Sequence, residues 1–231
     1  AMGRTEVEVF SSPVIGIIST GDELVPPEAD LKPGQIRDVN TPMLSAAVQH
    51  LGAKVIKTQI IPDRYDLLQQ TIKDLLPEVD LLLVSGGTSV GERDNLPLIL
   101  EELGQIFVHG IAIKPGKPTI VGEIEGKPVF GLPGNPVAAF FMFTVLVKTL
   151  IFNLNASKFD QPTFEASLTR AVSSNHGREE VILVRLETDL ADPVPSKSGL
   201  ISSVSRANGY ILVGRDQEGL PKGAAVSVYL L

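Results

Sequence analysis

Short apolar runs alternate with helical patterns over the first two thirds of the chain, and this alternation constrains its fold most. Val14–Ser19 is apolar up to its last residue, as expected of a strand buried on both faces, and Leu81–Ser85 repeats the pattern. Around and between them, apolar residues recur at helical spacing over residues 43–51 and 67–76. Strands alternating with helices predict right-handed crossovers, and therefore an α/β fold: a mostly parallel three-layer sandwich.

Local signals place the remaining elements of this sandwich. Thr41, which stands before a proline, is predicted to cap the first helix. Residues 53–61 and 106–113 are predicted strands, and a hairpin is predicted to turn at Gly126. Asn135, also followed by proline, is predicted to start a last, strongly apolar helix.

The pattern changes near residue 155, where period-2 alternation replaces helical spacing. We therefore predict two domains: an α/β domain over residues 12–155, followed by a small all-β barrel domain over residues 160–231. Residues 1–11 contain a strand-like segment with no obvious partner in the chain. We interpret it as the remnant strand of a preceding domain.

Composition excludes several classes of function. A formal net charge of -7 argues against nucleic acid as a partner, because phosphate contacts need a basic field. The chain has no cysteine, which excludes disulfides and thiolate metal ligands, and its three histidines lack ligand spacing. We see no signal-peptide pattern, and the apolar stretch 137–152 is short for a membrane span, so we predict a cytoplasmic protein without a membrane partner.

Four loops follow predicted strands and should meet at one edge of the sheet, where open parallel sheets bind ligands. They cover residues 19–23, 85–94, 114–118 and 131–136. Each has an ordinary structural explanation, because glycine-rich turns, solvated lysines and helix starts are common. Asp63 is equally compatible with a helix cap and with a functional carboxylate. The four loops taken together favour a binding site.

The charge distribution favours an anionic ligand. No acid lies between Glu102 and Glu123, yet both Lys114 and Lys117 do. The helix start after Asn135 adds free N–H groups and a positive dipole end. We therefore predict a phosphate or oxyanion site. Carboxylates at the same edge, Asp94 with Asp63 and Glu23 as further candidates, would suit Mg²⁺ bridging protein and phosphate oxygens.

Five motifs in this order and spacing resemble a known family. They lie at residues 19–24 (STGDEL), 38–40 (DVN), 85–94 (SGGTSVGERD), 114–118 (KPGKP) and 131–137 (GLPGNPV). The chain resembles the molybdenum insertases, or molybdopterin molybdenumtransferases, which are MoeA in bacteria and the E domain of gephyrin in animals. The resemblance covers nearly the whole chain. Because family members carry two further N-terminal domains, the chain resembles their C-terminal portion.

The resemblance implies a Mg²⁺-dependent reaction in which molybdate is inserted into adenylylated molybdopterin with release of AMP, and a homodimer in the full-length protein. It implies that Asp63 and Asp94 hold Mg²⁺. The residues that it implies to be catalytic are Glu23, Asp63, Asp94, Lys114 and Lys117. The candidate cofactor-binding residues are Thr20, Gly21, Asp22, Asn40, Gly86, Gly87, Ser89, Gly91, Pro118, Gly131, Pro133, Gly134, Asn135, Arg178 and Ser198. The match is looser at Arg178 and Ser198, since Arg-Glu-Glu stands where the family has Arg-Pro-Glu.

Two other functions remain open. One is a molybdopterin adenylyltransferase on the same α/β domain, which the Leu-Pro-Gly-Asn-Pro motif and the second domain disfavour. The other is a non-catalytic module that binds the pterin nucleotide or serves as a scaffold.

Overall fold

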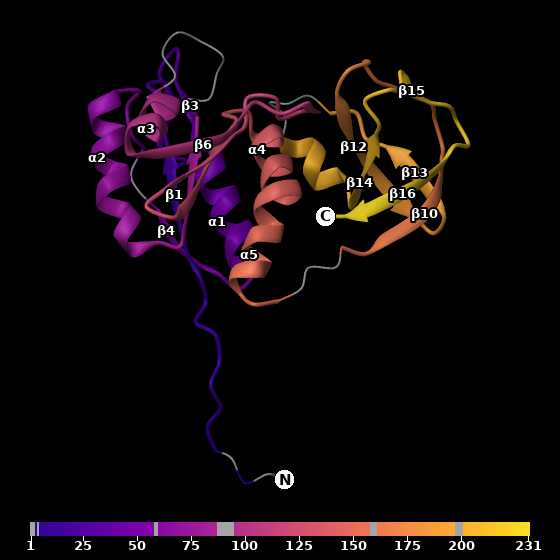
Figure 1. Cartoon of the computed structure of the whole chain (residues 1–231). Coiled ribbons are helices and arrows are strands. Elements are labelled where there is room, and N and C mark those ends of the chain that lie inside the picture. The colour runs from indigo at the N-terminus through magenta and orange to yellow at the C-terminus, as the bar shows by residue number, and fades with distance from the viewer. Residues whose placement is uncertain (1–2, 4, 58–59, 87–94, 158–160, 197–200) are drawn as a thin grey trace.

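A six-stranded mixed sheet forms the centre of the first domain (Figure 1). The computed structural model describes residues 3, 5–57, 60–86, 95–157, 161–196 and 201–231. In spatial order the strands are β4 (Lys54–Lys57), β1 (Val14–Ser19), β5 (Leu81–Ser85), β9 (Lys127–Leu132), β8 (Ile120–Ile124) and β6 (Gly104–His109). Neighbouring strands from β4 to β9 are parallel, and only β8 runs antiparallel to its neighbours. The predicted mostly parallel sheet is confirmed.

Helices cover both faces of this sheet. Helix α1 (Asn40–His50) and the continuous helix 136–154 share one apolar cluster with one face of the sheet. Helices α2 (Tyr65–Leu75) and α3 (Asn95–Leu103) share a second cluster with the other face. Because side chains alternate along a strand, Ile17 enters the first cluster and Ile18 the second. The predicted three-layer arrangement follows directly from this alternation.

The helix 136–154 changes type along its length. It comprises α4 (Pro136–Met142), a π-helical turn (Phe143–Val147) and α5 (Lys148–Leu154). By length and composition it could cross a membrane, but 50% of its most apolar window is buried inside this fold. Its packing against both the sheet and the barrel agrees with the predicted buried helix.

Two local predictions were wrong. Helix α1 begins at Asn40, before Thr41, because the Asp38 carboxylate accepts the Thr41 N–H at 3.1 Å and satisfies this free donor of the first turn. The predicted strand 106–113 is two strands: β6 ends at His109, and Ile113–Lys114 form β7. Gly110 interrupts them with a φ of 85°, in the left-handed region that favours glycine.

The second domain is a closed β-barrel. Its strands follow the ring β10 (Thr163–Leu168), β16 (Ala225–Leu230), β14 (Gly209–Val213), β12 (Glu179–Glu187) and β13 (Leu190–Pro193), and β13 returns to β10. Closure leaves these five strands without a free edge. The remaining short elements are β2 (Leu24–Val25), β3 (Ile36–Arg37), β11 (Val172–Ser173), β15 (Gly219–Leu220) and 3₁₀ turns at Leu76–Glu78 and Ile201–Arg206.

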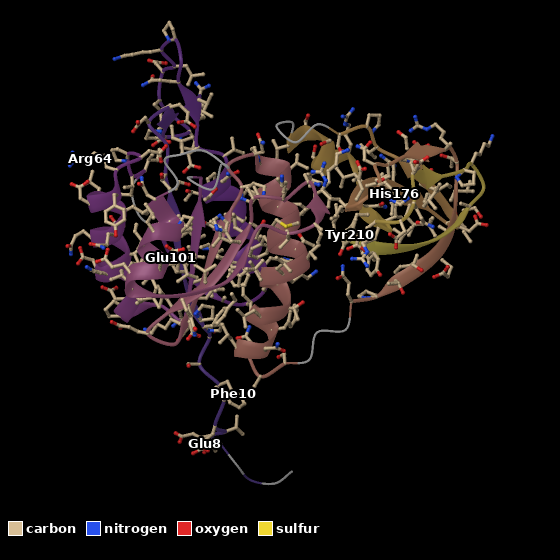
Figure 2. The ribbon with its side chains drawn as sticks, turned by 45° about the horizontal axis from the view of Figure 1, so that its top comes forward. Glu8, Phe10, Arg64, Glu101, His176 and Tyr210 are labelled. Atoms are coloured by element: carbon tan, nitrogen blue, oxygen red, sulfur yellow. The ribbon has the colours of Figure 1, made fainter. Side chains whose placement is uncertain are left out.

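The two domains share a core and a strand pairing. β7, which lies in the chain between β6 and β8 of the α/β sheet, pairs in parallel with β12 of the barrel. Tyr210 of β14, labelled in Figure 2, meets Phe141 of α4 edge-on at 5.8 Å between ring centroids. It also stacks on Tyr229 at 5.1 Å. The loop that leaves the α/β domain at β6 is therefore anchored in the barrel.

The N-terminal segment 5–13 forms no helix or strand. In Figure 1 it enters β1 from below, so the carboxyl ends of the parallel strands lie at the top of this view. Val7, Val9 and Phe10, the last at 76% exposure, are exposed in the described structure, and Figure 2 labels Phe10 on this segment. The interpretation of residues 1–11 as a remnant strand stays a prediction.

Candidate functional site

Buried polar side chains concentrate at the carboxyl ends of β1 and β5. Of the nine buried polar residues in the described ranges, six lie here. We call them the buried polar cluster: Ser19, Thr20, Asp38, Asn40, Thr41 and Ser85. Burying polar groups costs free energy unless each finds a partner, so packing alone would not place so many together.

Side-chain hydrogen bonds connect this cluster across the first strand and helix α1. The Ser19 and Thr41 hydroxyls lie 2.7 Å apart, and the Thr41 N–H is the one bound to Asp38. Asn40 donates one amide hydrogen to Ser85 Oγ at 2.7 Å and the other to the Gly134 carbonyl at 2.8 Å. One side chain of α1 therefore joins the end of β5 to the loop after β9.

The Asn40 side chain is incompletely satisfied. Its Oδ1 is buried and accepts no hydrogen bond. Among the described residues, no other buried side-chain oxygen or nitrogen lacks a hydrogen-bond partner. An amide oxygen can accept two hydrogen bonds, and leaving it without one in the interior costs about 1–3 kcal/mol. The cluster thus holds a spare acceptor beside two loops expected to bind a ligand.

Asp63 belongs to this edge of the sheet and does not cap helix α2. Its carboxylate accepts a hydrogen bond from the Thr20 hydroxyl, and its N–H donates to Asp22 Oδ1 at 3.1 Å. The position before α2 is held by Arg64, which makes no side-chain cap. Of the two explanations that the sequence left open for Asp63, the structure excludes the helix cap.

Two glycines let the loops approach one another. Gly86 has a φ of 92°, and a Cβ there would overlap the Thr20 carbonyl oxygen. A Cβ on Gly134 would lie 3.8 Å from Gly86 Cα, so these two backbones are near neighbours. Because any larger residue at position 86 would push the loop after β5 away from β1, this contact requires glycine.

The loop 114–118, which we call the lysine loop, lies where the α/β domain meets the barrel. Lys114 Nζ forms an ion pair with Glu180 Oε1 of β12 at 2.9 Å. A Cβ on Gly116 would collide with the Met142 side chain, so the loop packs tightly on α4. Lys117 is exposed. No hydrogen bond between described residues joins the lysine loop to the buried polar cluster.

The structure gathers some of the predicted site residues and separates others. Thr20, Asp22, Asp63, Asn40 and Gly134 are linked by the contacts above, and Gly21 joins them through its N–H to the Ile61 carbonyl at 3.1 Å. Three others take different places: Gly131 is buried within β9, Glu23 is exposed, and Arg178 is exposed just before β12. Pro133 is buried, whereas Pro118 and Asn135 are not. Gly87, Ser89, Gly91, Asp94 and Ser198 lie outside the described residues.

Sequence reasoning missed several members of the site. Ser19 and Ser85 each end a buried strand, which is a signal that could have found them. Glu180 gave no such signal, because it lies 66 residues after Lys114 in a different domain. Although no acidic residue lies near the two lysines in the sequence, the fold brings Glu180 to Lys114.

Metal-binding capacity at this edge rests on oxygen donors. The described residues contain no group of three or more His, Asp or Glu side chains suited to a metal ion. The Asp22 carboxylate accepts the Asp63 N–H, and the Asp63 carboxylate accepts the Thr20 hydroxyl, so both acidic residues lie at this edge. Mg²⁺ is usually held by one or two carboxylates together with substrate phosphates and water, so the residues present fit this ion.

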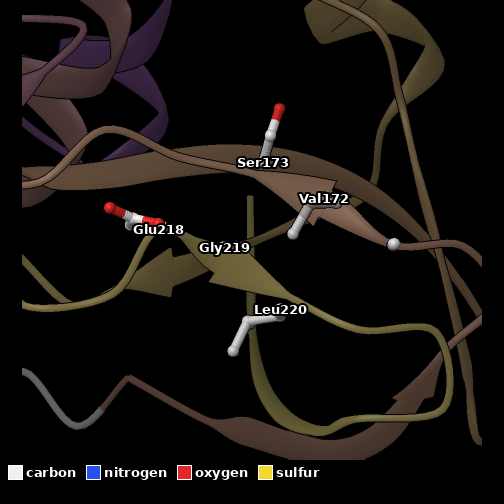
Figure 3. A pocket seen from close by; sticks show the side chains of 6 residues that line it. Val172, Ser173, Glu218, Gly219 and Leu220 are labelled. Atoms are coloured by element: carbon white, nitrogen blue, oxygen red, sulfur yellow. The ribbon is translucent and has the colours of Figure 1, made fainter.

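A hollow lies on the barrel, between β11 and β15 (Figure 3). It is lined by Ala171, Val172, Ser173, Glu218, Gly219 and Leu220. Ser173 points up in this view and Glu218 to the left, whereas Val172 and Leu220 point down. With a single carboxylate as its ionisable group, this hollow lacks the convergent polar groups found at the sheet edge.

Comparison with known families defines the class of this chain. Residues 16–153 match the family described as "Probable molybdopterin binding domain", which is more than half of the chain. Residues 165–231 match the "MoeA C-terminal region (domain IV)". The first match makes the chain a molybdopterin-binding domain protein. Both together, in this order, show that the chain belongs to the MoeA family.

Individual relatives agree with this assignment. The chain is 33% identical to a molybdopterin molybdenumtransferase of Staphylococcus epidermidis, over 99% of this chain and 56% of that protein. It is also 33% identical to the molybdopterin molybdenumtransferase of Bacillus subtilis, over 99% of this chain and 55% of that one. The crystal structure of a molybdopterin biosynthesis MoeA protein from Pyrococcus horikoshii superposes with a TM-score of 0.85 at 39% identity, over 95% of this chain and 54% of that one. The chain spans about half the length of the relatives it matches.

Proposed function

We propose that the chain provides the substrate-binding and catalytic region of a molybdopterin molybdenumtransferase. In this proposal it acts in molybdenum cofactor biosynthesis, inserting molybdate into adenylylated molybdopterin with release of AMP. The observation that carries the proposal is the buried polar cluster, with its spare Asn40 acceptor, beside the Thr20–Asp63 hydrogen bond at the carboxyl edge of the sheet. Family membership supports the identity of the substrates.

Each part of the edge has a role in this reaction. Gly86 and Gly134 keep the loop backbones close, so that N–H groups can approach a bound nucleotide. Thr20 orients the Asp63 carboxylate through its hydrogen bond. Lys114 and Lys117 supply positive charge for molybdate or phosphate oxygens, because cleavage of a phosphoanhydride depends chiefly on charge neutralisation and positioning.

Mg²⁺ would be held by Asp63 together with Asp94, and when bound it would neutralise charge on the phosphoanhydride. The protein contribution is then to fix the carboxylate at residue 63 and to keep the site electrostatically complementary. We further propose a cytoplasmic enzyme that acts as a homodimer when full-length. The adenylyltransferase alternative is disfavoured by the match to the MoeA C-terminal region.

The test is a titration of this chain with adenylylated molybdopterin, followed by pterin fluorescence in the presence of Mg²⁺. Thr20→Val removes the hydroxyl that orients Asp63 and should weaken binding at least tenfold. Thr71→Val is the matched control, because that hydroxyl bonds only to the Leu67 carbonyl of its own helix, at 2.8 Å. Equal binding by both variants would contradict the proposed site.

A second measurement separates an enzyme from a binding module. Molybdate is added to the preformed complex and AMP release is followed. Release above the rate without protein supports the transferase. Tight binding without release would leave a binding module as the function of this chain.

A further inference from the structure

An ion pair joins the lysine loop to the barrel, and the pairing of two strands fixes its position. β7 and β12 pair in parallel, with Lys114 directly opposite Glu180. Residues opposite each other in neighbouring strands place their side chains on the same face of the sheet. The short Lys114–Glu180 contact is therefore set by the backbone register between the two domains, and it does not depend on a chance meeting of flexible side chains.

The carboxylate of this pair is held on both oxygens. Glu180 Oε1 contacts Lys114, and Oε2 accepts the Ser174 hydroxyl at 2.9 Å. Ser174 is itself fixed, because its N–H donates to the Glu218 carbonyl at 2.8 Å. The Glu180 side chain is 15% exposed, whereas that of Lys114 is 43% exposed. The carboxylate is thus the fixed, shielded partner, and the ammonium is the partner that a ligand can reach.

We propose that Glu180 sets the affinity of the oxyanion site, acting as an internal counter-ion of Lys114 that repels an incoming oxyanion. The inference rests on the proposed function, in which Lys114 contacts molybdate. With Glu180 in place, the Lys114 charge is largely balanced in the free protein. Oxyanion affinity is therefore kept lower than a lone lysine would give, and it depends on how the barrel is docked.

The size of the effect follows from Coulomb's law. A dianion and a carboxylate about 6 Å apart repel each other in water by an amount that corresponds to roughly tenfold in affinity. Removing the Glu180 charge should therefore tighten the binding of inorganic molybdate by about this factor. If Glu180 served mainly to hold the ammonium in place, its removal would weaken binding.

Calorimetric titration of the chain with inorganic molybdate tests the inference. Glu180→Gln keeps the shape and the acceptor for Ser174 but removes the charge, and it should bind molybdate about tenfold more tightly. Glu179→Gln is the matched control, because it removes the same charge one residue earlier, on the opposite face of β12, and Glu179 is in no ion pair among the described residues. Unchanged or weaker binding by Glu180→Gln, or equal tightening by both variants, would overturn the inference.

A second readout does not require molybdate to bind. Acetylation of Lys114 by acetic anhydride, measured by peptide mass spectrometry relative to Lys117, should be faster in Glu180→Gln because the amine is no longer held in the ion pair. An unchanged ratio would show that Glu180 does not control Lys114. If the wild-type protein failed to bind molybdate but the acetylation ratio still changed, the proposed function at this loop would be contradicted. The role of Glu180 in the ion pair would then still hold.

Discussion

Asn40, the first residue of helix α1, donates its amide to Ser85 Oγ at the end of strand β5, 2.7 Å away. The same amide donates to the Gly134 carbonyl, so helix α1, strand β5 and the loop after β9 meet at one side chain. Replacing it leaves those partners unsatisfied in a buried setting.

Asn40→Ala should lower the free energy of unfolding by about 1–3 kcal/mol, since buried acceptors lose their donor. Urea denaturation measures this change. Gln49→Ala, at an exposed position of the same helix, should stay within about 0.5 kcal/mol of wild type. If Asn40→Ala lowered the free energy of unfolding no more than Gln49→Ala, helix α1, strand β5 and the loop after β9 would be held together by other contacts.

Gly86→Ala should destabilise the protein more than Gly126→Ala. Both glycines have positive φ, at 92° and 75°, so both substitutions bear the cost of that backbone conformation, about 1–2 kcal/mol. At Gly126 nothing lies within 4 Å of an added Cβ, whereas at Gly86 the Cβ overlaps the Thr20 carbonyl. The difference between the two midpoints of thermal unfolding isolates the steric cost, and equal midpoints would contradict the close approach of β1 and β5.

Asp63→Asn should make nucleotide binding insensitive to Mg²⁺. The amide still accepts from Thr20 but has no charge to attract a divalent cation. We expect EDTA to weaken binding of adenylylated molybdopterin at least tenfold in wild type and hardly at all in the variant. Asp66→Asn is the control, because Asp66 is an exposed carboxylate paired with Arg64. Retention of full Mg²⁺ dependence by Asp63→Asn would remove Asp63 from the metal site.

Tyr210 should make stability fall in alkali. Burial raises the pKa of its phenol above the ordinary value of about 10, so the folded state holds this proton more tightly than the unfolded state. Its contribution is complete below about pH 10 and is lost as the pH rises from there through the folded-state pKa. Thermal unfolding midpoints between neutral pH and strong alkali should therefore decline more steeply for wild type than for Tyr210→Phe.

Parallel decline of the two proteins would show that Tyr210 ionises as readily when folded as when unfolded. Near-ultraviolet absorbance gives an independent check. The chain has three tyrosines and no tryptophan, so the difference between wild type and Tyr210→Phe reports ionisation of this phenol.

Much of the fold could be predicted because its signals are local. The continuous apolar runs at 14–19 and 81–85 indicate buried strands, and helical spacing indicates the layers that cover them. The split of 106–113 could not be predicted, because β7 exists only through its pairing with β12 of the barrel. The start of α1 could not be predicted either, because it depends on the Asp38 side chain, which accepts the Thr41 N–H, and not on the proline that follows Thr41.

For the candidate site, the sequence by itself determined which loops are candidates for binding, because glycines, lysines and carboxylates follow strands that share an edge. Only the tertiary structure decided how these groups are used. In the fold, Asp63 accepts a hydrogen bond from Thr20 and does not cap a helix, and Glu180 forms an ion pair with Lys114. The physical reason is that hydrogen bonds and ion pairs depend on distances of about 3 Å. Residues far apart in sequence reach such distances only in the folded chain, and Lys114 and Glu180 reach theirs only when the two domains pack together.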